Sequence, residues 1–324
     1  MIEQTTSEPI SSHRRGRRWG HRRVGVTAGA CATLGLLGVL AGCGSNSTAT
    51  DPAADSSASG DDAIPSAVGS PIQAPSDTST ATTTVPVYLV GDSPSGPRLY
   101  RAPVAVPQDA PLAGAVQYLM SGKTPDPDYR SSYDSGAFGE VTYDPQKGFT
   151  VALTDPALER AHGMSRHDAM IATQQLVYTL EAVQGTKDAP VRVIADGRPT
   201  RLFGVSTADG LKPVDQLDVL NLVNVLSPTD RAHVAGSFEA GGLASSPEAT
   251  VPWTVENSNG KVVRRGFATA SGWMDRLYPW KATVSGLAPG TYTFTATTDD
   301  TSDGEGTRPS TDTKTFTVTR GAAG

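Results

Sequence analysis

The sequence predicts two folded domains of different class: an α+β domain, with two helices on a small mixed or antiparallel sheet, and an all-β sandwich. Three observations lead to this prediction. The chain has 324 residues, enough for about two domains. Strand and helix patterns alternate between residues 85 and 213. Short strands separated by turn signals then fill residues 222–319 without a helical period.

The first domain, residues 85–213, is expected to contain two β-hairpins. Residues 85–90 form a strand pattern, and residues 98–101 are its expected partner across a Gly/Pro turn. A second hairpin is expected where residues 138–143 and 149–154 flank a cluster of turn residues.

Two helices are expected between these strands. The first begins at Pro111 and ends at Gly122, and its apolar face consists of Leu112, Val116, Leu119 and Met120. The second covers residues 166–183, because Ser165 and Asp168 have the spacing of a capping box. Its apolar face consists of Ala169, Ala172, Leu176, Leu180 and Val183. A strand at 191–195 follows and turns at Asp196-Gly197 toward residues 201–203.

The second domain, residues 222–319, is expected to consist of strands alone, after a short linking helix within residues 213–220. Asn259-Gly260 is a strong signal for a two-residue hairpin turn. Alternation predicts three inward-facing sets, which are Val251, Trp253 and Val255, then Trp280, Ala282 and Val284, then Tyr292, Phe294 and Ala296.

Four motifs of the first domain point to a family. They are Val-Tyr-Leu-Val at 87–90, Leu-Met-Ser-Gly at 119–122, Gln-Leu-Val-Tyr-Thr-Leu at 175–180 and Val-Arg-Val-Ile-Ala-Asp-Gly at 191–197. Together they resemble the GerMN domain, which is named after spore-germination and sporulation proteins and occurs in many Gram-positive lipoproteins. The resemblance implies a role in envelope assemblies, a relationship to ring-forming modules of secretion systems, and no established catalytic residues.

The second domain carries a resemblance of its own. Its motifs are residues 224–228, 234–236, 248–251, 260–263 and 302–304. They are similar to the immunoglobulin-like domain that commonly follows GerMN, although Pro247-Glu248-Ala249 stands where Phe-Glu-Ala is usual. The resemblance implies that this sandwich is immunoglobulin-like.

The N-terminal region has the pattern of an export signal. Six arginines within residues 14–23 precede an apolar run over residues 24–42, and Leu40-Ala41-Gly42-Cys43 ends that run. This last stretch resembles the lipobox of bacterial lipoproteins, in which the cysteine thiol is acylated and becomes the mature N-terminus. We therefore expect a lipoprotein signal peptide at 1–42 and a lipid anchor on Cys43, with the protein on the extracellular face of the cell membrane. A transmembrane helix with an incidental cysteine is the alternative, because the run is just long enough.

Residues 43–84 are expected to form a disordered tether, because Ser, Thr, Ala, Asp, Pro and Gly dominate them. A glycosylated stalk would use the same residues. The formal charge is −6, and residues 1–42 carry +4, which leaves −10 for the remainder. This acidity argues against nucleic acid and anionic headgroups as partners, so membrane attachment has to be covalent. Cys31 lies in the predicted signal, so no disulfide or thiolate metal site is expected.

Patterns for catalysis or metal binding are weak. Ser258 and Lys261 have the Ser-x-x-Lys spacing of penicillin-binding enzymes, but the serine is expected in a hairpin turn and not at the start of a helix. His162 and His167 are five residues apart, on different sides of a helix, so surface histidines are expected and not a metal pair. We expect no catalytic residue, no cofactor and no metal site.

One aromatic segment is a candidate binding surface. Residues 272–280 contain Trp273 and Tyr278 in an expected loop, where they could contact a glycan or a protein. The alternative is that these rings plug one end of the sandwich.

The sequence therefore predicts a non-catalytic, membrane-anchored envelope lipoprotein that binds an envelope protein or cell-wall glycan, with self-association through the first domain as a further expectation. The family resemblance suggests sporulation or germination as the process. The alternative function is a cell-wall hydrolase with carboxylates in an inter-domain cleft, for which the sequence nominates no pair.

Overall fold

The computed structural model describes residues 81–300, 306 and 308–320, and these residues lie in one compact unit. The predicted signal peptide, the predicted lipidation site Cys43 and nearly all of the predicted tether lie outside the described residues. Within the described ranges, no helix is both long and apolar enough to cross a membrane.

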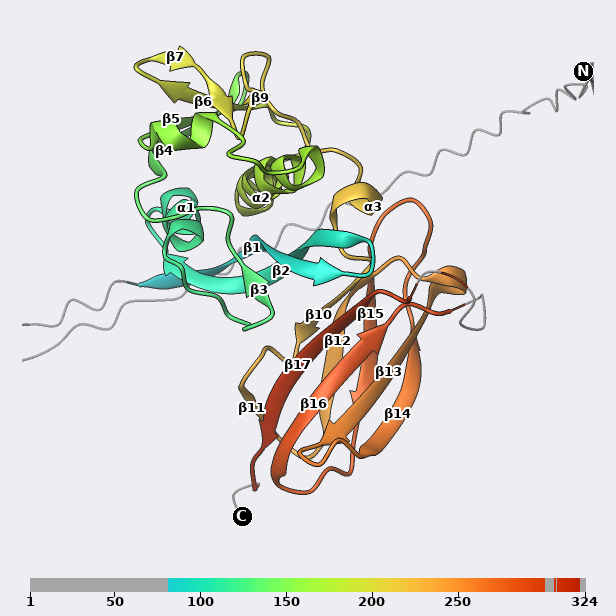
Figure 1. Ribbon diagram of the computed structural model, residues 1–324. Coiled ribbons are helices and arrows are strands. Elements are labelled where there is room, and N and C mark those ends of the chain that lie inside the picture. Colours follow the sequence, from blue (N-terminus) through green and yellow to red (C-terminus); the bar gives the residue numbers. More distant parts are fainter. Residues whose placement is uncertain (1–80, 301–305, 307, 321–324) are drawn as a thin grey trace, which may run out of the picture. The chain divides into compact units, whose positions relative to one another are not determined.

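The first domain contains two larger sheets and one two-stranded ribbon (Figure 1). One sheet has the order β2-β1-β3, and β1 and β2 form the long antiparallel hairpin that the sequence predicts. The other has the order β4-β5-β6-β7, in which β5 and β6 are parallel. The ribbon pairs β8 with β9. The strands are β1 (Thr82–Ser93), β2 (Gly96–Pro107), β3 (Tyr129–Arg130), β4 (Phe138–Asp144), β5 (Gly148–Leu153), β6 (Val191–Ala195), β7 (Arg198–Pro199), β8 (Arg201–Leu202) and β9 (Val205–Ser206).

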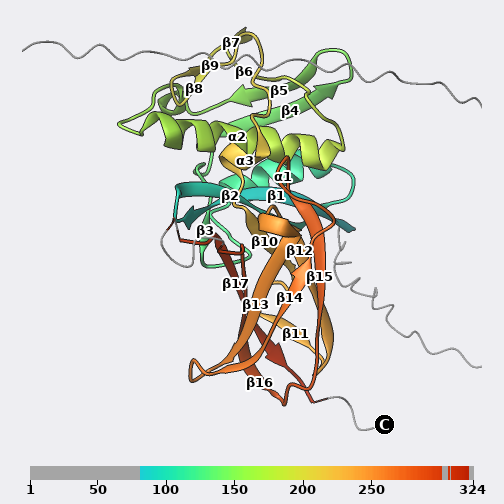
Figure 2. The same cartoon turned by 90° about the vertical axis from the view of Figure 1, so that its right-hand side faces the viewer.

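The two predicted helices are α1 (Pro111–Met120) and α2 (Arg166–Gln184), and a 3-10 turn η1 (Pro156–Glu159) precedes α2. The Ser165 side chain accepts a hydrogen bond from the Asp168 amide, which caps α2 as the sequence predicts. Every residue of α2 from 171 to 181 is buried, so apolar and polar sides alike are covered. Figure 2 shows the reason, because α2 lies between the β1–β2 sheet and the β4–β5 sheet.

This layering confirms the α+β class and corrects one detail of it. The sequence patterns place all strands of the domain in one sheet with the helices on one face, whereas the strands divide between sheets above and below the helices. Polar residues of α2 are buried because they form hydrogen bonds with backbone groups that pack against the helix. The Thr179 hydroxyl accepts from the Tyr88 amide at 3.0 Å, and Gln175 Nε2 donates to the Tyr88 carbonyl at 3.0 Å.

The second domain is a β-sandwich of two sheets, with the orders β10-β12-β15 and β11-β17-β16-β13-β14. The predicted Asn259-Gly260 turn joins β13 to β14. The strands are β10 (Val223–Ser227), β11 (Ala232–Val234), β12 (Phe238–Ala244), β13 (Thr250–Asn257), β14 (Val262–Thr269), β15 (Tyr278–Val284), β16 (Gly290–Thr297) and β17 (Thr311–Val318), with a 3-10 turn η2 (Pro247–Ala249) before β13.

Aromatic rings fill the core of this sandwich. Phe294 is fully buried and stacks on Trp280 with a centroid distance of 6.2 Å and on Trp253 with one of 5.9 Å. Trp280 is buried, as its alternation predicts, while Trp253 is half-buried at the edge of the same stack. The inward-facing sets of the sequence thus meet in one hydrophobic core.

A linker with the short helix α3 (Gln216–Val219) joins the domains, where the sequence predicts a linking helix. A separate apolar cluster surrounds it. Leu277, from the loop between β14 and β15, packs there with Val219, Leu220 and residues of the first domain. The second domain therefore inserts a side chain into an apolar cluster that the first domain builds.

Candidate interaction site at the domain boundary

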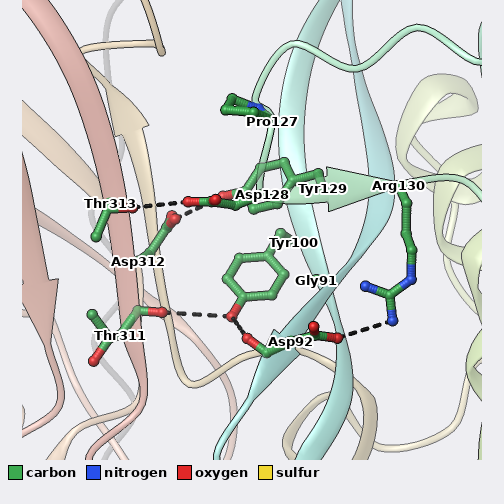
Figure 3. A pocket seen from close by; sticks show the side chains of 10 residues that line it. All are labelled: Gly91, Asp92, Tyr100, Pro127, Asp128, Tyr129, Arg130, Thr311, Asp312 and Thr313. Atoms are coloured by element: carbon green, nitrogen blue, oxygen red, sulfur yellow. Dashed lines mark hydrogen bonds and ion pairs between the residues drawn. The ribbon is translucent and has the colours of Figure 1, made fainter.

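A groove of about 500 Å³ lies where the first domain meets the start of β17 (Figure 3). Its lining comes from β1, β2, the loop before β3, β3 itself and β17. The lining residues are Gly91, Asp92, Tyr100, Pro127, Asp128, Tyr129, Arg130, Thr311, Asp312 and Thr313. Three of them are carboxylates, so the groove is acidic apart from Arg130.

A buried ionic cluster lies beside this groove and joins the domains. Lys314 Nζ lies 2.7 Å from Asp126 Oδ2 and 2.8 Å from Asp312 Oδ1, and it donates to the Tyr129 hydroxyl at 2.6 Å. The Lys314 side chain is 5% exposed and both carboxylates are 3% exposed. Burial on this scale is tolerated because each charge has charge-assisted hydrogen bonds. The cluster holds two carboxylates and one ammonium group, so it keeps a net negative charge.

Asp312 carries the most hydrogen bonds in this cluster. Its Oδ2 accepts from the Val225 amide at 2.6 Å and from Asn224 Nδ2 at 3.0 Å, while its Oδ1 accepts from the Tyr129 hydroxyl at 2.8 Å. Asn224 in turn accepts from the Arg101 amide of β2 at 2.9 Å. The hydrogen bonds therefore connect both sheets of the sandwich with β2 and β3 of the first domain.

Further contacts hold the rim of the groove. The Thr313 hydroxyl donates to Asp128 Oδ2 at 3.0 Å, and Arg130 forms an exposed ion pair with Asp92 at 2.9 Å. The Tyr100 hydroxyl donates to the Asp92 carbonyl at 3.0 Å and lies 3.5 Å from the Thr311 carbonyl.

The two tyrosines of the groove act as hydrogen-bond donors. Burial, followed by the charge of Asp312, raises the pKa of Tyr129 well above its ordinary value. Burial and the same carboxylate also raise the pKa of Tyr100. Both hydroxyls therefore keep their protons at neutral pH. Tyr129 donates to Asp312 across the boundary, whereas Tyr100 donates to the Asp92 carbonyl within the first domain.

Converging carboxylates at an inter-domain groove are what the alternative hydrolase hypothesis requires. Here, however, the four carboxylates Asp92, Asp126, Asp128 and Asp312 already accept hydrogen bonds or ion pairs from protein groups. Within the described ranges, no group of three or more His, Cys, Asp or Glu side chains is arranged to hold a metal ion. The arrangement is suited to holding two domains together.

The other residues that the sequence singles out do not assemble into a site. Ser258 lies in the turn between β13 and β14, as expected, and not at a helix start. His162 contacts the Ala157 carbonyl at 2.6 Å, whereas His167 contacts the Pro97 carbonyl at 3.0 Å. The two histidines thus bind separate backbone groups.

Trp273 lies in the loop between β14 and β15, whereas Tyr278, which the sequence places in the same loop, is the first residue of β15. Trp273 is 42% exposed and its neighbour Met274 is 66% exposed. Tyr278 is half-buried, donates its hydroxyl to Asp275 at 2.7 Å, and lies under the Arg276 guanidinium at 4.6 Å. Tyr278 therefore supports the loop, and Trp273 with Met274 forms its exposed tip.

This tip is held firmly at both ends. The Met274 amide donates to the Ser245 hydroxyl at 3.1 Å, and the Leu277 amide donates to Gln216 Oε1 at 3.2 Å. Met274 adopts a φ of 86°, which is a strained conformation for a residue with a side chain. The sequence identified the aromatic residues, but the exposure of Met274 follows only from the loop's anchors.

Sequence reasoning missed the ionic cluster, although β17 contains a signal for it. Asp312 and Lys314 alternate with threonines and share the inward face of β17 with Phe316 and Val318. Charged residues on an inward face need partners. The sequence could have shown that need, but it could not identify Asp126 and Tyr129 as the partners.

The layered α+β domain followed by an immunoglobulin-like sandwich defines the class of this chain. Residues 86–201 match the family described as sporulation and spore germination, and residues 222–305 match the immunoglobulin-like domain of bacterial spore germination. The chain therefore carries these two domains in this order, and both predicted resemblances are confirmed. A non-enzymatic role connected with germination is what such domains suggest.

Solved structures include two similar chains. CopC from Methylosinus trichosporium OB3b is 25% identical, with 30% of this chain and 90% of that chain covered and a TM-score of 0.22. The tandem GerMN domains of the sporulation protein GerM from Bacillus subtilis are 14% identical, with 64% and 62% covered and a TM-score of 0.34. No curated protein matches the chain. The assignment of the domains rests on the family matches.

Proposed function

We propose that this chain is an exported, lipid-anchored envelope protein that acts by binding other envelope components, in a process of the sporulation or germination class. The observation that carries the proposal is the boundary between the domains. Its buried charges, Asp126, Asp312 and Lys314, are engaged with each other and with Tyr129. The two domains therefore present their outer surfaces as one rigid unit, which suits a scaffold.

Anchoring is proposed from the sequence alone, through Cys43 at the end of the apolar run. A long polar segment between Cys43 and β1 would let the folded unit reach components away from the membrane. The exposed tip Trp273-Met274 is the proposed contact for a protein partner, because aromatic residues and Met are enriched at interfaces.

The test has two arms on intact cells. In the first, cells grow with an alkyne analogue of palmitate, and the wild-type chain is compared with Cys43→Ser. We expect label and membrane retention for the wild type and release of the unlabelled variant into the medium. In the second arm, the wild-type chain is crosslinked on cells and the captured species are identified. Retention of the variant in membranes, or no captured envelope component, would contradict the proposal.

A cell-wall hydrolase is the second candidate, because Asp92, Asp128 and Asp312 line a groove of about 500 Å³. It is the weaker candidate, since these carboxylates are engaged by Arg130, Thr313 and the ionic cluster. Incubation of the full chain with purified peptidoglycan should release no new reducing ends. Release that disappears in Asp128→Asn would favour the hydrolase.

A further inference from the structure

The outer face of the five-stranded sheet carries an unusual array of threonines. In β16 and β17 every outward position is threonine, while the residues between them point inward. The array consists of Thr291, Thr293, Thr295 and Thr297 on β16, and Thr311, Thr313, Thr315 and Thr317 on β17. The register pairs all eight across the two strands, from Thr291 opposite Thr317 to Thr297 opposite Thr311. Figure 1 shows β16 and β17 side by side in this sheet.

One row of this array continues across two more strands. Thr313 pairs with Thr295, Thr295 pairs with Thr254 on β13, and Thr254 pairs with Arg265 on β14. Three strand spacings of about 4.8 Å give this row a length of about 14 Å. The hydroxyls of Thr254 and Thr295 have no hydrogen-bond partner within the part of the chain that the structure describes. They are therefore available to a ligand.

A hollow lies at each end of the row. Thr313 lines the acidic groove at the domain boundary. Thr254, Thr295 and Arg265 line a second groove of about 340 Å³, together with Phe267, which is 72% exposed. The lining of this second groove is largely apolar and contains Pro252 and Trp253. A neutral hydroxyl surface thus leads from an aromatic platform to a polar groove.

The chemistry of this face selects the ligand. Threonine hydroxyls donate and accept hydrogen bonds but carry no charge, and the eight paired positions contain no ionised group. Asp92 and Asp128 at one end would repel a polyanion. A protein partner is disfavoured, because threonine is under-represented among residues that dominate protein interfaces. A sugar ring, in contrast, combines hydroxyls with an apolar face that stacks on an aromatic ring such as Phe267.

We propose that the outer face of the five-stranded sheet binds an uncharged polysaccharide of the cell envelope, which lies across the strands from Phe267 toward the domain-boundary groove. This inference deepens the proposed envelope function, on which its choice of ligand rests. Phe267 would supply a stacking platform, and Thr254, Thr295 and Arg265 would bind the sugar hydroxyls.

The test is isothermal titration of the full chain, in a nonionic detergent, with three oligosaccharides of equal length. Two are uncharged, a hexamer of β-1,4-linked N-acetylglucosamine and cellohexaose, and the third is an anionic hexagalacturonate. We expect at least one neutral oligosaccharide to bind, and the anionic one to bind at least about tenfold more weakly. Failure of both neutral ligands to bind, or equal binding of the anionic ligand, would overturn the inference.

Variants then place the site on this face. Phe267→Ala should weaken binding by about tenfold, and Thr254→Val and Thr295→Val by about fivefold each. These side chains are exposed or half-buried, and valine keeps the β-branched shape, so circular dichroism should show a native fold. The control is Thr142→Val on an exposed position of β4, which should bind like the wild type. Wild-type affinity in Phe267→Ala and in both threonine variants would overturn the inference.

The two proposals fail separately. A chain that is lipid-anchored and crosslinks to an envelope protein, but binds no neutral oligosaccharide, overturns the polysaccharide site and leaves the envelope function standing. A chain that binds the oligosaccharide but is not anchored overturns the proposed lipid anchoring and leaves the polysaccharide site standing.

Discussion

Lys314 of the second domain and Asp126 of the first domain form a buried ion pair with 2.7 Å between Nζ and Oδ2, although 188 residues separate them in the chain. The Tyr129 ring lies beneath the same ammonium group, 4.5 Å from Nζ to the ring centroid. An ammonium group in this position fixes how the sandwich sits against β3, because separating the pair would leave a buried charge without its partner. The ion pair therefore holds the two domains together as one unit.

Loss of Lys314 should destabilise the whole unit. Lys314→Met leaves Asp126 and Asp312 buried without their counter-ion, so we expect the free energy of unfolding to fall by about 3–5 kcal/mol. Urea unfolding followed by tryptophan fluorescence measures this loss. The control is Lys281→Met, which breaks only an exposed ion pair with Glu239 and should cost less than about 1 kcal/mol. A loss below 1 kcal/mol for Lys314→Met would show that the ion pair does not hold the domains together.

Leu277 should stabilise the contact between the domains through apolar packing, as Lys314 does through its ion pair. Leu277→Ala removes a buried side chain from the cluster around α3, and we expect a loss of about 2–4 kcal/mol. Faster hydrogen exchange at the Leu277 amide, which donates to Gln216, should accompany it. Met274→Ala is the control, because Met274 is exposed and should change stability by less than about 0.5 kcal/mol. Equal stability of the two variants would contradict this role for Leu277.

Glu181 should make stability depend on pH. Burial raises the pKa of this carboxyl from 4.5 to about 7, while its hydrogen bond from the Ala189 amide opposes the shift. The folded protein therefore holds this proton more tightly than the unfolded chain. Its contribution is fully present below pH 4.5 and is lost as the pH rises through 7.

Glu181→Gln tests this pH dependence. The side-chain amide of the glutamine can still accept the hydrogen bond from the Ala189 backbone amide, but it cannot ionise. The variant should therefore be more stable than the wild type at pH 8 and nearly equal to it at pH 4. Urea midpoints between pH 4 and pH 8 measure the difference. Glu140→Gln, at an exposed position of β4, should retain the wild-type profile. Parallel profiles for Glu181→Gln and the wild type would refute the assignment.

Trp273 should affect partner capture without affecting the fold. Because this ring is 42% exposed at the loop tip, Trp273→Ala should change the free energy of unfolding by less than about 0.5 kcal/mol. We expect reduced crosslinking to the protein partner on intact cells and unchanged binding of neutral oligosaccharides. Phe267→Ala should show the opposite pattern. Undiminished crosslinking of Trp273→Ala would exclude the loop tip as the contact.

Local rules were sufficient for most elements of this chain. The capping of α2 by Ser165, the turn at Asn259-Gly260 and the inward alternation of Val251 and Val255 depend on neighbours within a few residues, and the structure confirms each. The family motifs could also be recognised from the sequence, because they are contiguous segments. The division of the first domain into separate sheets could not be predicted, since strand patterns do not specify which strands pair.

The sequence by itself determined the two domain classes, their order and most of their elements, because periodicity and turn residues act locally. Only the tertiary structure decided what the charged and aromatic residues do. It joined Lys314 to Asp126, used Tyr278 as a support while exposing Trp273, and aligned the threonines of β16 with those of β17. The pairing of Lys314 with Asp126 brings together residues that are 188 positions apart, and no local pattern encodes such a meeting.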